Sequence, residues 1–201
     1  MKLQVVQEKK PEWLNIQLRL NEKFPKVKQT LKSNALVTVC QEAHCPNISE
    51  CWNSGTATFM ILGDTCTRGC RFCNVKTGKG QEIDESEPEK IANVIKEWKL
   101  SYIVITSVDR DDLEDQGSGH FNRVIRKVKE ANPDALVEVL IPDFRGDRKC
   151  LERIKEAKPD VVGHNIETVK RLQSKVRDRR ANYEQSLSVL KFFKDNGFYT
   201  K

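Results

Sequence analysis

Short apolar runs recur along the chain and are separated by longer segments with a different hydrophobic pattern. The run at residues 102–106 is continuously apolar, which is typical of a parallel strand buried on both faces. Similar runs bounded by turn residues predict further strands. The predicted strands cover residues 58–62, 102–106, 136–141, 160–164 and 198–200.

Between these runs, apolar residues recur every three or four positions, as on one face of a helix. Ser86 and Glu89 have the spacing of a capping box, and Asp147 is a predicted N-cap. Asn132-Pro133 and Asn196-Gly197 are predicted helix ends. The four predicted faces are Ile91, Val94, Ile95 and Trp98; Phe121, Val124, Ile125 and Val128; Cys150, Leu151, Ile154 and Ala157; and Tyr183, Leu187, Leu190 and Phe193.

The alternation of strands and helices predicts an α/β fold of parallel βα units, as in a barrel. In such folds the loops that follow the strands gather at one rim, where functional residues lie. The loops expected there cover residues 66–73, 107–112, 143–146 and 164–167.

The N-terminal part, residues 1–39, shows only weak periodicity, and Pro11 and Pro25 interrupt it. We expect a mostly irregular arm that packs on the domain, with a short helix at residues 24–31; a disordered tail is the alternative. The sequence thus predicts an N-terminal extension at residues 1–57 and a main domain at residues 58–201.

The composition is that of a soluble protein. Of 201 residues, 38% are hydrophobic and 32% are charged, and no run approaches the 18 apolar residues that a membrane span needs. The N-terminus has no apolar core of a signal peptide, so we expect a cytoplasmic protein. In that reducing compartment, seven cysteines point to metal binding rather than disulfides.

The net charge of +6 is concentrated in the last quarter of the chain. It is densest in residues 170–180, here called the basic segment, which contains Lys170, Arg171, Lys175, Arg177, Arg179 and Arg180. No aromatic residues interleave with these charges, which disfavours a nucleic-acid site. An acidic protein partner, an anionic ligand and a solvated surface all remain compatible with the charge.

Three cysteines, Cys66, Cys70 and Cys73, follow the first predicted strand at a C-x3-C-x2-C spacing. A structural zinc ion normally has four protein ligands, whereas each iron of a cubane cluster binds one thiolate. Three local cysteines therefore favour an iron–sulfur cluster with one open iron. A zinc site with a distant fourth ligand, or buried unligated thiols, are the alternatives.

A second block, Cys40, Cys45 and Cys51, has a C-x4-C-x5-C spacing. Zinc with His44 as fourth ligand is possible, but His44 directly precedes Cys45, which makes shared coordination of one ion awkward. We interpret this block as a second iron–sulfur cluster. The seventh cysteine, Cys150, lies on a predicted helix face and is expected to be a small core residue.

The C-x3-C-x-aromatic-C pattern after a first barrel strand resembles the radical S-adenosylmethionine (SAM) superfamily. Further stretches, together with the second cysteine block, resemble the lipoyl synthase family within it. These are residues 10–14, 40–52, 59–64, 65–76, 106–113, 138–146 and 164–168.

The resemblance implies a partial (β/α) barrel of the TIM type with a cysteine-containing extension, two [4Fe-4S] clusters and SAM. In this family an electron from the open cluster splits SAM, and the resulting radical removes hydrogens at C6 and C8 of an octanoyl group on an acidic lipoyl-carrier domain. The second cluster is consumed as the sulfur donor. A ferredoxin or flavodoxin would supply electrons, no membrane is involved, and no catalytic side chain beyond the cluster ligands is implied.

Polar residues on the predicted rim are candidate SAM contacts. Alternatives stay open: residues 109–112 could be mutually paired loop charges, Glu138 a structural acid, and His164 a structural histidine rather than a base. The candidates are Phe72 beside the adenine, Ser107 and Asp109 at the methionine end, Glu138, Asn165 and Glu167 at the ribose or amine, and Arg177 at the carboxylate.

The family resembled continues past the point that corresponds to Lys201, through later strands and an Arg-Ser-Ser-Tyr-like motif whose serine is the fourth ligand of the second cluster. We therefore expect a fragment of a longer product, or one half of a split enzyme, with poor cluster binding and little turnover alone. Two other functions remain alternatives: a radical SAM enzyme with an auxiliary cluster that acts on a small molecule, and a zinc-binding nucleic-acid module.

Overall fold

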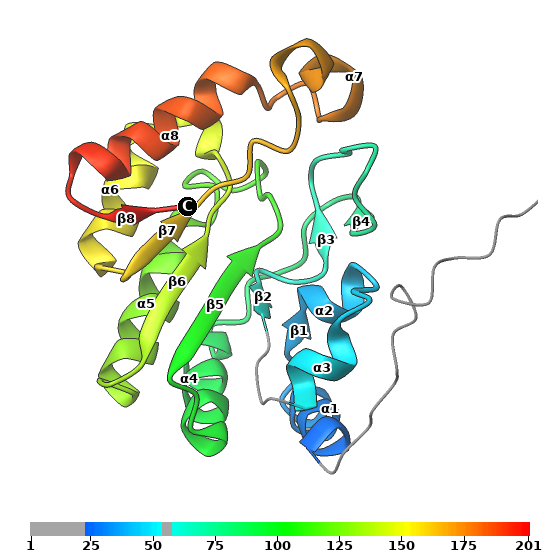
Figure 1. Cartoon of the computed structure of the whole chain (residues 1–201), viewed down its shortest axis with the longest axis vertical. Helices are drawn as coiled ribbons and strands as arrows, with labels where there is room; N and C mark the ends of the chain where they lie inside the picture. The colour runs from blue at the N-terminus through cyan, green and yellow to red at the C-terminus, as the bar shows by residue number, and fades with distance from the viewer. Residues whose placement is uncertain (1–22, 54–57) are drawn as a thin grey trace, which may run out of the picture.

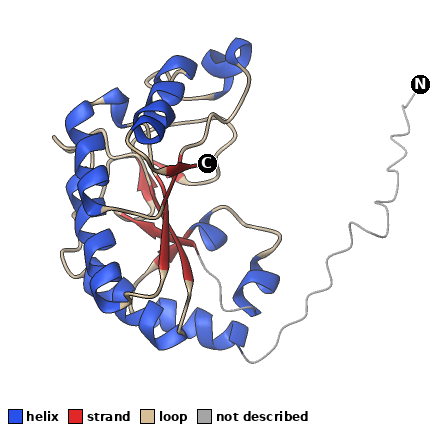
Figure 2. Ribbon diagram, turned by 60° about the vertical axis from the view of Figure 1, so that its left-hand side comes forward, coloured by secondary structure: helices blue, strands red, loops and turns tan. Residues whose placement is uncertain are grey.

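The computed structural model describes residues 23–53 and 58–201. Its centre is a six-stranded sheet with the order β1-β2-β5-β6-β7-β8, in which all neighbours are parallel except β1 and β2. Helices line one face of this curved sheet, and the other face is turned toward the N-terminal elements (Figures 1 and 2). This is the predicted α/β architecture.

Each predicted strand is present, although its bounds differ from the prediction by up to one residue at either end. The hydrophobic runs form β2 (Thr58–Ile61), β5 (Tyr102–Ser107), β6 (Leu136–Leu140), β7 (Val161–Gly163) and β8 (Tyr199–Thr200). Three two-residue strands were not predicted: β1 (Val37–Thr38), and the pair β3 (Thr65–Cys66) and β4 (Lys76–Thr77), which forms a separate parallel ladder. Runs this short carry no periodicity that could identify them.

The four predicted helices are confirmed as α4 (Glu87–Trp98), α5 (Ser118–Ala131), α6 (Arg148–Ala157) and α8 (Tyr183–Asp195). The predicted N-terminal helix is α1 (Lys23–Ser33). Short helices lie in the loops: α2 (Val39–Glu42), α3 (Ile48–Asn53), η2 (Phe144–Gly146), η3 (Lys170–Leu172) and α7 (Gln173–Val176).

The two faces of the sheet differ in what they pack against. Side chains that alternate along the strands, such as Phe59, Ile105 and Val139, stand beside one another in register and are fully buried with the apolar faces of the helices. The next positions, such as Met60 and Thr106, lie on the opposite face. Helix packing therefore buries one face and leaves the other available for a site.

Two details of the helix prediction are wrong. Ser86 makes no cap to α4, because its hydroxyl instead donates to Asp84 at 2.5 Å and its backbone is already helical. On α8, Leu187 is exposed, whereas Ser186 is fully buried. The polar Ser186 is turned inward because its hydroxyl is bonded to two side chains of the site described below. The cap by Asp147 is confirmed, since its carboxylate accepts from Lys149 N at 2.8 Å.

The described part of the N-terminal extension shares the core of the main domain. Val27, Leu31, Leu36 and Trp52 are buried in the same apolar cluster as the strands, and β1 pairs with β2. Most of the predicted irregular arm lies outside the described residues, as do residues 10–14. Within the described residues, no helix combines the length and the apolar character that crossing a membrane would require.

The turn that leaves β2 has a left-handed backbone at Leu62 (φ 69°) and Gly63 (φ 89°). A carboxylate oxygen of Glu87 accepts from Leu62 N at 3.1 Å, and Gly117 lies against the Leu62 side chain. A Cβ at Gly117 would come within 2.4 Å of Leu62 Cδ1, and Leu62 is itself buried. Close packing thus holds this turn in place.

We expect Gly117→Ala to lower the free energy of unfolding by about 2–4 kcal/mol, because overpacking adds to the strain of a positive φ. Gly197→Ala is the matched control, since Gly197 has a similar φ of 85° but nothing within 4 Å of the added Cβ. It should cost only about 1–2 kcal/mol. Urea denaturation of both variants measures the difference, and equal losses would show that the contact with Leu62 is unimportant.

Candidate metal and cofactor site

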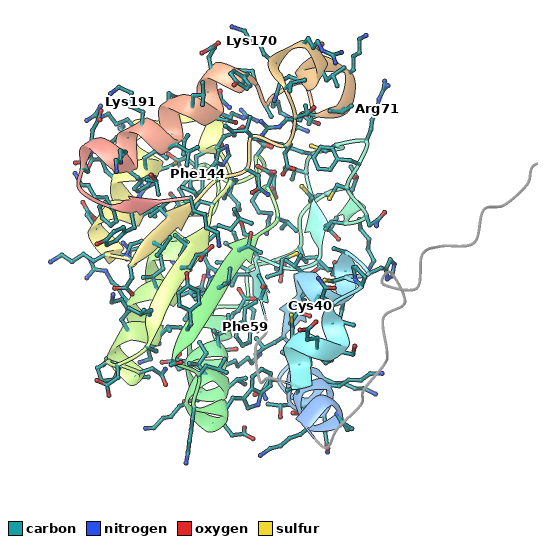
Figure 3. All side chains as sticks on the ribbon, viewed as in Figure 1. Cys40, Phe59, Arg71, Phe144, Lys170 and Lys191 are labelled. Atoms are coloured by element: carbon teal, nitrogen blue, oxygen red, sulfur yellow. The ribbon has the colours of Figure 1, made fainter. Side chains whose placement is uncertain are left out.

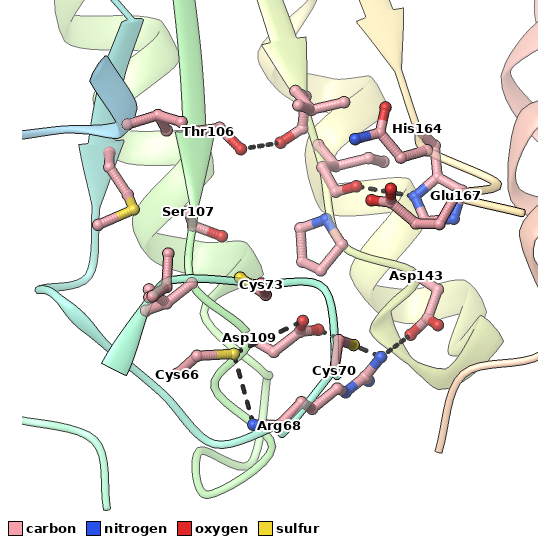
Figure 4. A pocket seen from close by; sticks show the side chains of 18 of the residues that line it. Cys66, Arg68, Cys70, Cys73, Thr106, Ser107, Asp109, Asp143, His164 and Glu167 are labelled. Atoms are coloured by element: carbon pink, nitrogen blue, oxygen red, sulfur yellow. Dashed lines mark hydrogen bonds and ion pairs between the residues drawn. The ribbon is translucent and has the colours of Figure 1, made fainter. Parts of the chain in front are cut away.

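A cavity of about 420 Å³ opens at the carboxyl ends of the central strands. Thr106, Ser107 and Leu140 contribute to its wall from β5 and β6, and Pro142 and His164 from the loops that follow β6 and β7. Figure 4 shows residues 66–73, here called the cysteine loop, together with Asp109 and Asp143 at this cavity near the strand ends. The predicted rim is therefore where the structure has its cavity.

The loop between β3 and β4 carries Cys66, Cys70 and Cys73, and all three line the cavity (Figure 4). Gly78 N donates to Cys66 O at 2.9 Å, and Cys73 N donates to Cys70 O at 3.1 Å. These two bonds close the loop at its base and within its final turn. The folded loop thereby brings the three thiols to one wall of the cavity.

Two of the sulfur atoms accept backbone hydrogen bonds. Arg68 N donates to Cys66 Sγ at 3.4 Å, and Asp178 N donates to Cys70 Sγ at 3.2 Å. Burial raises the pKa of Cys66 to about 11, so this thiol needs a bound cation to become a thiolate at neutral pH. Amide donors beside sulfur are the surroundings that metal-bound thiolates favour, so this wall fits an iron–sulfur group.

The second cysteine block also forms a local group. Cys40 is buried in α2 and Cys51 lies in α3, and Cys45 N donates to Cys40 O at 3.1 Å. The pKa of Cys51 is raised first by burial and then by the charges of Cys40 and Cys45, which lie within electrostatic range of it. Val39, next to Cys40, lines the main cavity, so the block lies beside it.

No three His, Cys, Asp or Glu side chains among residues 23–53 and 58–201 are already arranged to bind a single metal ion. Cys150 behaves as predicted: it is buried in the apolar core on α6, and its Sγ donates to Asp115 O at 3.3 Å.

Arg68, inside the cysteine loop, clamps this loop to two strand ends. Its side chain is 3% exposed and binds Asp111 through two hydrogen bonds, at 2.7 Å and 3.0 Å. Its Nη1 lies 3.2 Å from Asp109 Oδ1 and 2.9 Å from Asp143 Oδ1. Asp109 and Asp111 follow β5, and Asp143 follows β6, so one guanidinium joins the three loops.

The two aspartates after β5 differ in their surroundings. Burial raises the pKa of Asp109 to about 6, although the charge of Arg68 opposes the shift. Burial would also raise the pKa of Asp111, but hydrogen bonds from Arg68 and Arg145 lower it to about 2. Asp111 is therefore a fixed negative charge beneath the cysteine loop. Mutual pairing within residues 109–112 joins only Arg110 and Asp112 among the described residues. Asp111 instead pairs with arginines outside this stretch, and Asp109 also lines the cavity.

Three polar atoms in the cavity wall are buried without a hydrogen-bond partner among the described residues: Ser107 Oγ, Asp143 Oδ2 and Arg177 Nε. Buried polar groups are nearly always bonded, so orphans gathered around one cavity indicate a missing polar ligand. The side chains of Arg177 and Asp143 face each other, with Arg177 Nη2 4.0 Å from Asp143 Oδ2. A ligand bound in the cavity can form hydrogen bonds with both Asp143 Oδ2 and Arg177 Nε.

Arg177 is held by a chain of hydrogen bonds. Its Nη1 donates to Ser186 Oγ at 2.9 Å, and Ser186 Oγ lies 2.9 Å from His164 Nε2. His164 Nδ1 is 2.8 Å from Ile141 O, and a carbonyl only accepts, so Nδ1 carries the proton. Burial lowers the pKa of His164, which keeps the ring neutral. His164 is thus the structural histidine of the alternative, and it positions Arg177 through Ser186.

The cavity brings together six of the seven predicted SAM contacts. Their positions range from half-exposed, for Phe72, to buried beneath the rim, for Arg177. They are Phe72, Ser107, Asp109, Asn165, Glu167 and Arg177.

Glu138, the seventh, lies away from the cavity wall. Its carboxylate accepts from the Tyr102 hydroxyl and from Lys201 Nζ at 3.2 Å. It is on the inner face of β6, but Leu140 stands between it and the rim on the same strand face. The alternative of a structural acid fits this position better than a cofactor contact.

The basic segment packs against the cysteine loop, a contact that no pattern in the sequence predicts. Asp178 Oδ2 accepts from Gly69 N at 3.0 Å, and Arg180 Nη2 donates to Thr67 O at 2.7 Å. The hydrogen bonds from Arg180 lower the pKa of Asp178 and keep it ionised. The density of charge in a sequence does not show which groups these charges contact. The available signal was Asp178, the single acidic residue of the basic segment.

Comparisons with known proteins show what the chain is similar to. Residues 60–201 match the family described as the Radical SAM superfamily. The crystal structure of methylornithine synthase (PylB) resembles 70% of this chain and 42% of its own with a TM-score of 0.55 and 12% identity, a likeness of fold alone.

Curated relatives extend the match to nearly the whole sequence. Lipoyl synthase of Halobacterium salinarum is 55% identical over 198 residues, which cover 96% of this chain and 64% of that protein. Lipoyl synthase of Caldicellulosiruptor saccharolyticus is 57% identical over 199 residues, or 98% of this chain and 70% of that protein. The mitochondrial lipoyl synthase of Populus trichocarpa is 54% identical over 92% of this chain and 50% of its own length. The chain thus spans between half and about two thirds of the length of these relatives.

Proposed function

Because the chain belongs to the radical SAM superfamily and, within it, to the lipoyl synthase family, we propose that the whole protein inserts two sulfur atoms at C6 and C8 of a protein-bound octanoyl group. The observation that carries this proposal is the cavity itself. It joins the three thiols of the C-x3-C-x2-C loop to three buried polar atoms that lack partners among the described residues.

Two [4Fe-4S] clusters are proposed, one on Cys66, Cys70 and Cys73 and the other on Cys40, Cys45 and Cys51. When bound, they supply the electron that cleaves SAM and the sulfur that enters the product. The protein's task is to hold both close to one substrate. The position of Val39 in the cavity wall, next to Cys40, supports the second cluster facing the same space as the first.

The cavity residues have distinct proposed tasks toward SAM. Arg177 presents a guanidinium whose Nε is unpaired among the described residues, and such a group binds a carboxylate well. Ser107 Oγ and Asp143 Oδ2 offer hydrogen bonds to the amine and neighbouring polar groups. Phe72, 50% exposed and lining the cavity, offers a flat face to the adenine. Asn165 and Glu167 are left for the ribose.

The apolar part of the same wall suits the rest of the substrate. Met60, Val104, Leu140 and Ile141 line the cavity and can pack against a hydrocarbon chain while excluding water. The proposed substrate is an octanoylated lysine of an acidic lipoyl-carrier domain, and the proposed electron donor is a ferredoxin or flavodoxin. The division into an extension at residues 1–57 and a barrel at residues 58–201 also remains a proposal.

Anaerobic reconstitution with iron and sulfide tests the proposed clusters. In the whole protein, we expect about eight irons per polypeptide and an EPR signal of the reduced protein that changes when SAM is added, as two cubanes with one open iron require. About four irons with the same SAM response would overturn the second cluster. A colourless protein that binds zinc would contradict the proposed iron–sulfur enzyme and favour a zinc-binding module.

A further inference from the structure

We propose that the exposed side of the basic segment, together with Arg71 and Phe72, is the surface on which an acidic carrier protein docks while its acylated lysine enters the cavity. This inference rests on the proposed function and deepens it, because it names the surface that selects a protein-bound substrate. We call this surface the docking face; its residues are Arg71, Phe72, Val169, Lys170, Arg171, Lys175 and Arg179.

Several cations on the docking face lack an acidic partner in the described part of the chain. Some exposed cations elsewhere are paired, as Lys191 is with Asp195 at 2.9 Å. On the docking face, Lys170 pairs with Glu184, and the neighbouring Asp178 is already bound by Arg180. The exposed cations left without an ion pair are Arg71, Arg171, Lys175 and Arg179. This side of the molecule therefore presents uncompensated positive charge.

The docking face is continuous with the mouth of the cavity. Arg71 N donates to Val176 O at 2.8 Å, which fixes the basic segment to the cysteine loop. Phe72, next to Arg71, lines the cavity, and so does Arg177 of the basic segment. Arg71 and Lys170 project from the same end of the molecule in Figure 3, beyond the cysteine loop and α7. A partner that binds here is thus placed against the entrance to the site.

The docking face also carries apolar groups. Phe72 is 50% exposed and Val169 is 55% exposed, and both are among the few large apolar side chains that face solvent. Apolar groups surrounded by cations resemble the arrangement of a protein interface, in which a polar rim surrounds an apolar centre. Binding of single-stranded nucleic acid uses several aromatic side chains for base stacking, and Phe72 is the one aromatic residue of this face.

The positive charge of the docking face has a role in selecting the substrate of the proposed reaction. The acyl group alone makes only apolar contacts with the cavity. Such contacts distinguish poorly between an acyl chain on a carrier protein and the acyl chain of a lipid. Complementary charge at the entrance steers the carrier to the site and sets its orientation, at a cost of sensitivity to salt. The docking face thereby supplies selectivity that the acyl pocket lacks.

Charge reversal tests the proposal through binding. In Arg171→Glu/Lys175→Glu, we expect the Kd for a fluorescently labelled octanoylated carrier domain, measured by anisotropy at low salt, to rise about tenfold or more. The matched control is Lys96→Glu/Lys194→Glu, which makes the same change of charge at exposed positions in the last turns of α4 and α8. Its Kd should change less than about twofold. Equal effects of the two variants would overturn the docking face.

Further measurements separate this inference from the proposed function. Displacement of the carrier by a short single-stranded RNA, at concentrations equal to the carrier's Kd, would overturn the protein partner in favour of nucleic acid. In the whole protein with both clusters, we compare turnover of the carrier with that of an uncharged octanoyl-lysyl peptide. A preference for the carrier that disappears with salt is expected. Equal turnover of both substrates would overturn the docking face alone, and turnover of neither would overturn the proposed function.

Discussion

Arg68→Met is expected to lower the free energy of unfolding by about 3–5 kcal/mol and to abolish stable cluster binding on the cysteine loop. The change keeps most of the side-chain volume but removes the guanidinium that joins the loop to β5 and β6. Asp111 and Asp143, with side chains 3% and 0% exposed, would then be buried without their main counter-ion. Urea denaturation and iron analysis after reconstitution measure the two effects.

Arg110→Met is the matched control for this prediction. Arg110 is as buried as Arg68, with 3% of its side chain exposed, but its carboxylate partner, Asp112, is 30% exposed and can regain water. We expect a smaller loss, about 1–2 kcal/mol, and normal iron content. Adding Asp111→Asn to Arg68→Met should recover part of the lost stability, because one uncompensated buried charge is removed. A loss no larger than that of Arg110→Met would contradict the clamp.

The prediction of the central fold from sequence succeeded because it used strong signals. The strands β2, β5, β6 and β7 are buried against helices, so their apolar runs are long enough to detect. Two-residue strands such as β1 and β3 carry no such pattern. Their pairing depends on contacts distant in sequence, including the register of Val37 with Met60. Local sequence therefore predicted the layers of the fold but missed its smallest ladders.

The candidate site shows a similar limit. Cysteine spacing and position after strands predicted the cysteine loop and most of the cavity wall, because those signals are local. The partners of these residues are not local: Asp178 donates its N–H to Cys70 from more than a hundred residues away, and Ser186 links Arg177 to His164. Glu138 lies outside the cavity wall for a related reason, since the register of β6 places it below the rim and beside Lys201.

Arg177→Lys is expected to raise the dissociation constant of SAM about 10- to 100-fold, the loss of a charge-assisted hydrogen bond of roughly 1.5–3 kcal/mol. Isothermal titration of the reconstituted protein measures it. The reason is that different nitrogen atoms of the Arg177 guanidinium have different partners. Its Nη1 is occupied by Gln173 and Ser186, at 3.2 Å and 2.9 Å, while its Nε is unpaired among the described residues. One ammonium cannot keep the first set of bonds and also present a planar fork to a carboxylate.

The outcome separates charge from geometry in the binding of SAM. Lysine keeps the positive charge, so an unchanged affinity would show that Arg177 acts only as a distant cation or as part of the wall. Arg126→Lys is the control, because Arg126 is exposed on α5 and, within the described residues, donates only to a backbone carbonyl, that of Glu156 at 3.3 Å. A loss confined to Arg177→Lys, with iron content preserved, would mean that the chain Ile141–His164–Ser186–Arg177 holds the guanidinium at the angle that the ligand requires. The neutral His164 would then act on the cofactor without touching it, through the orientation of a neighbouring arginine.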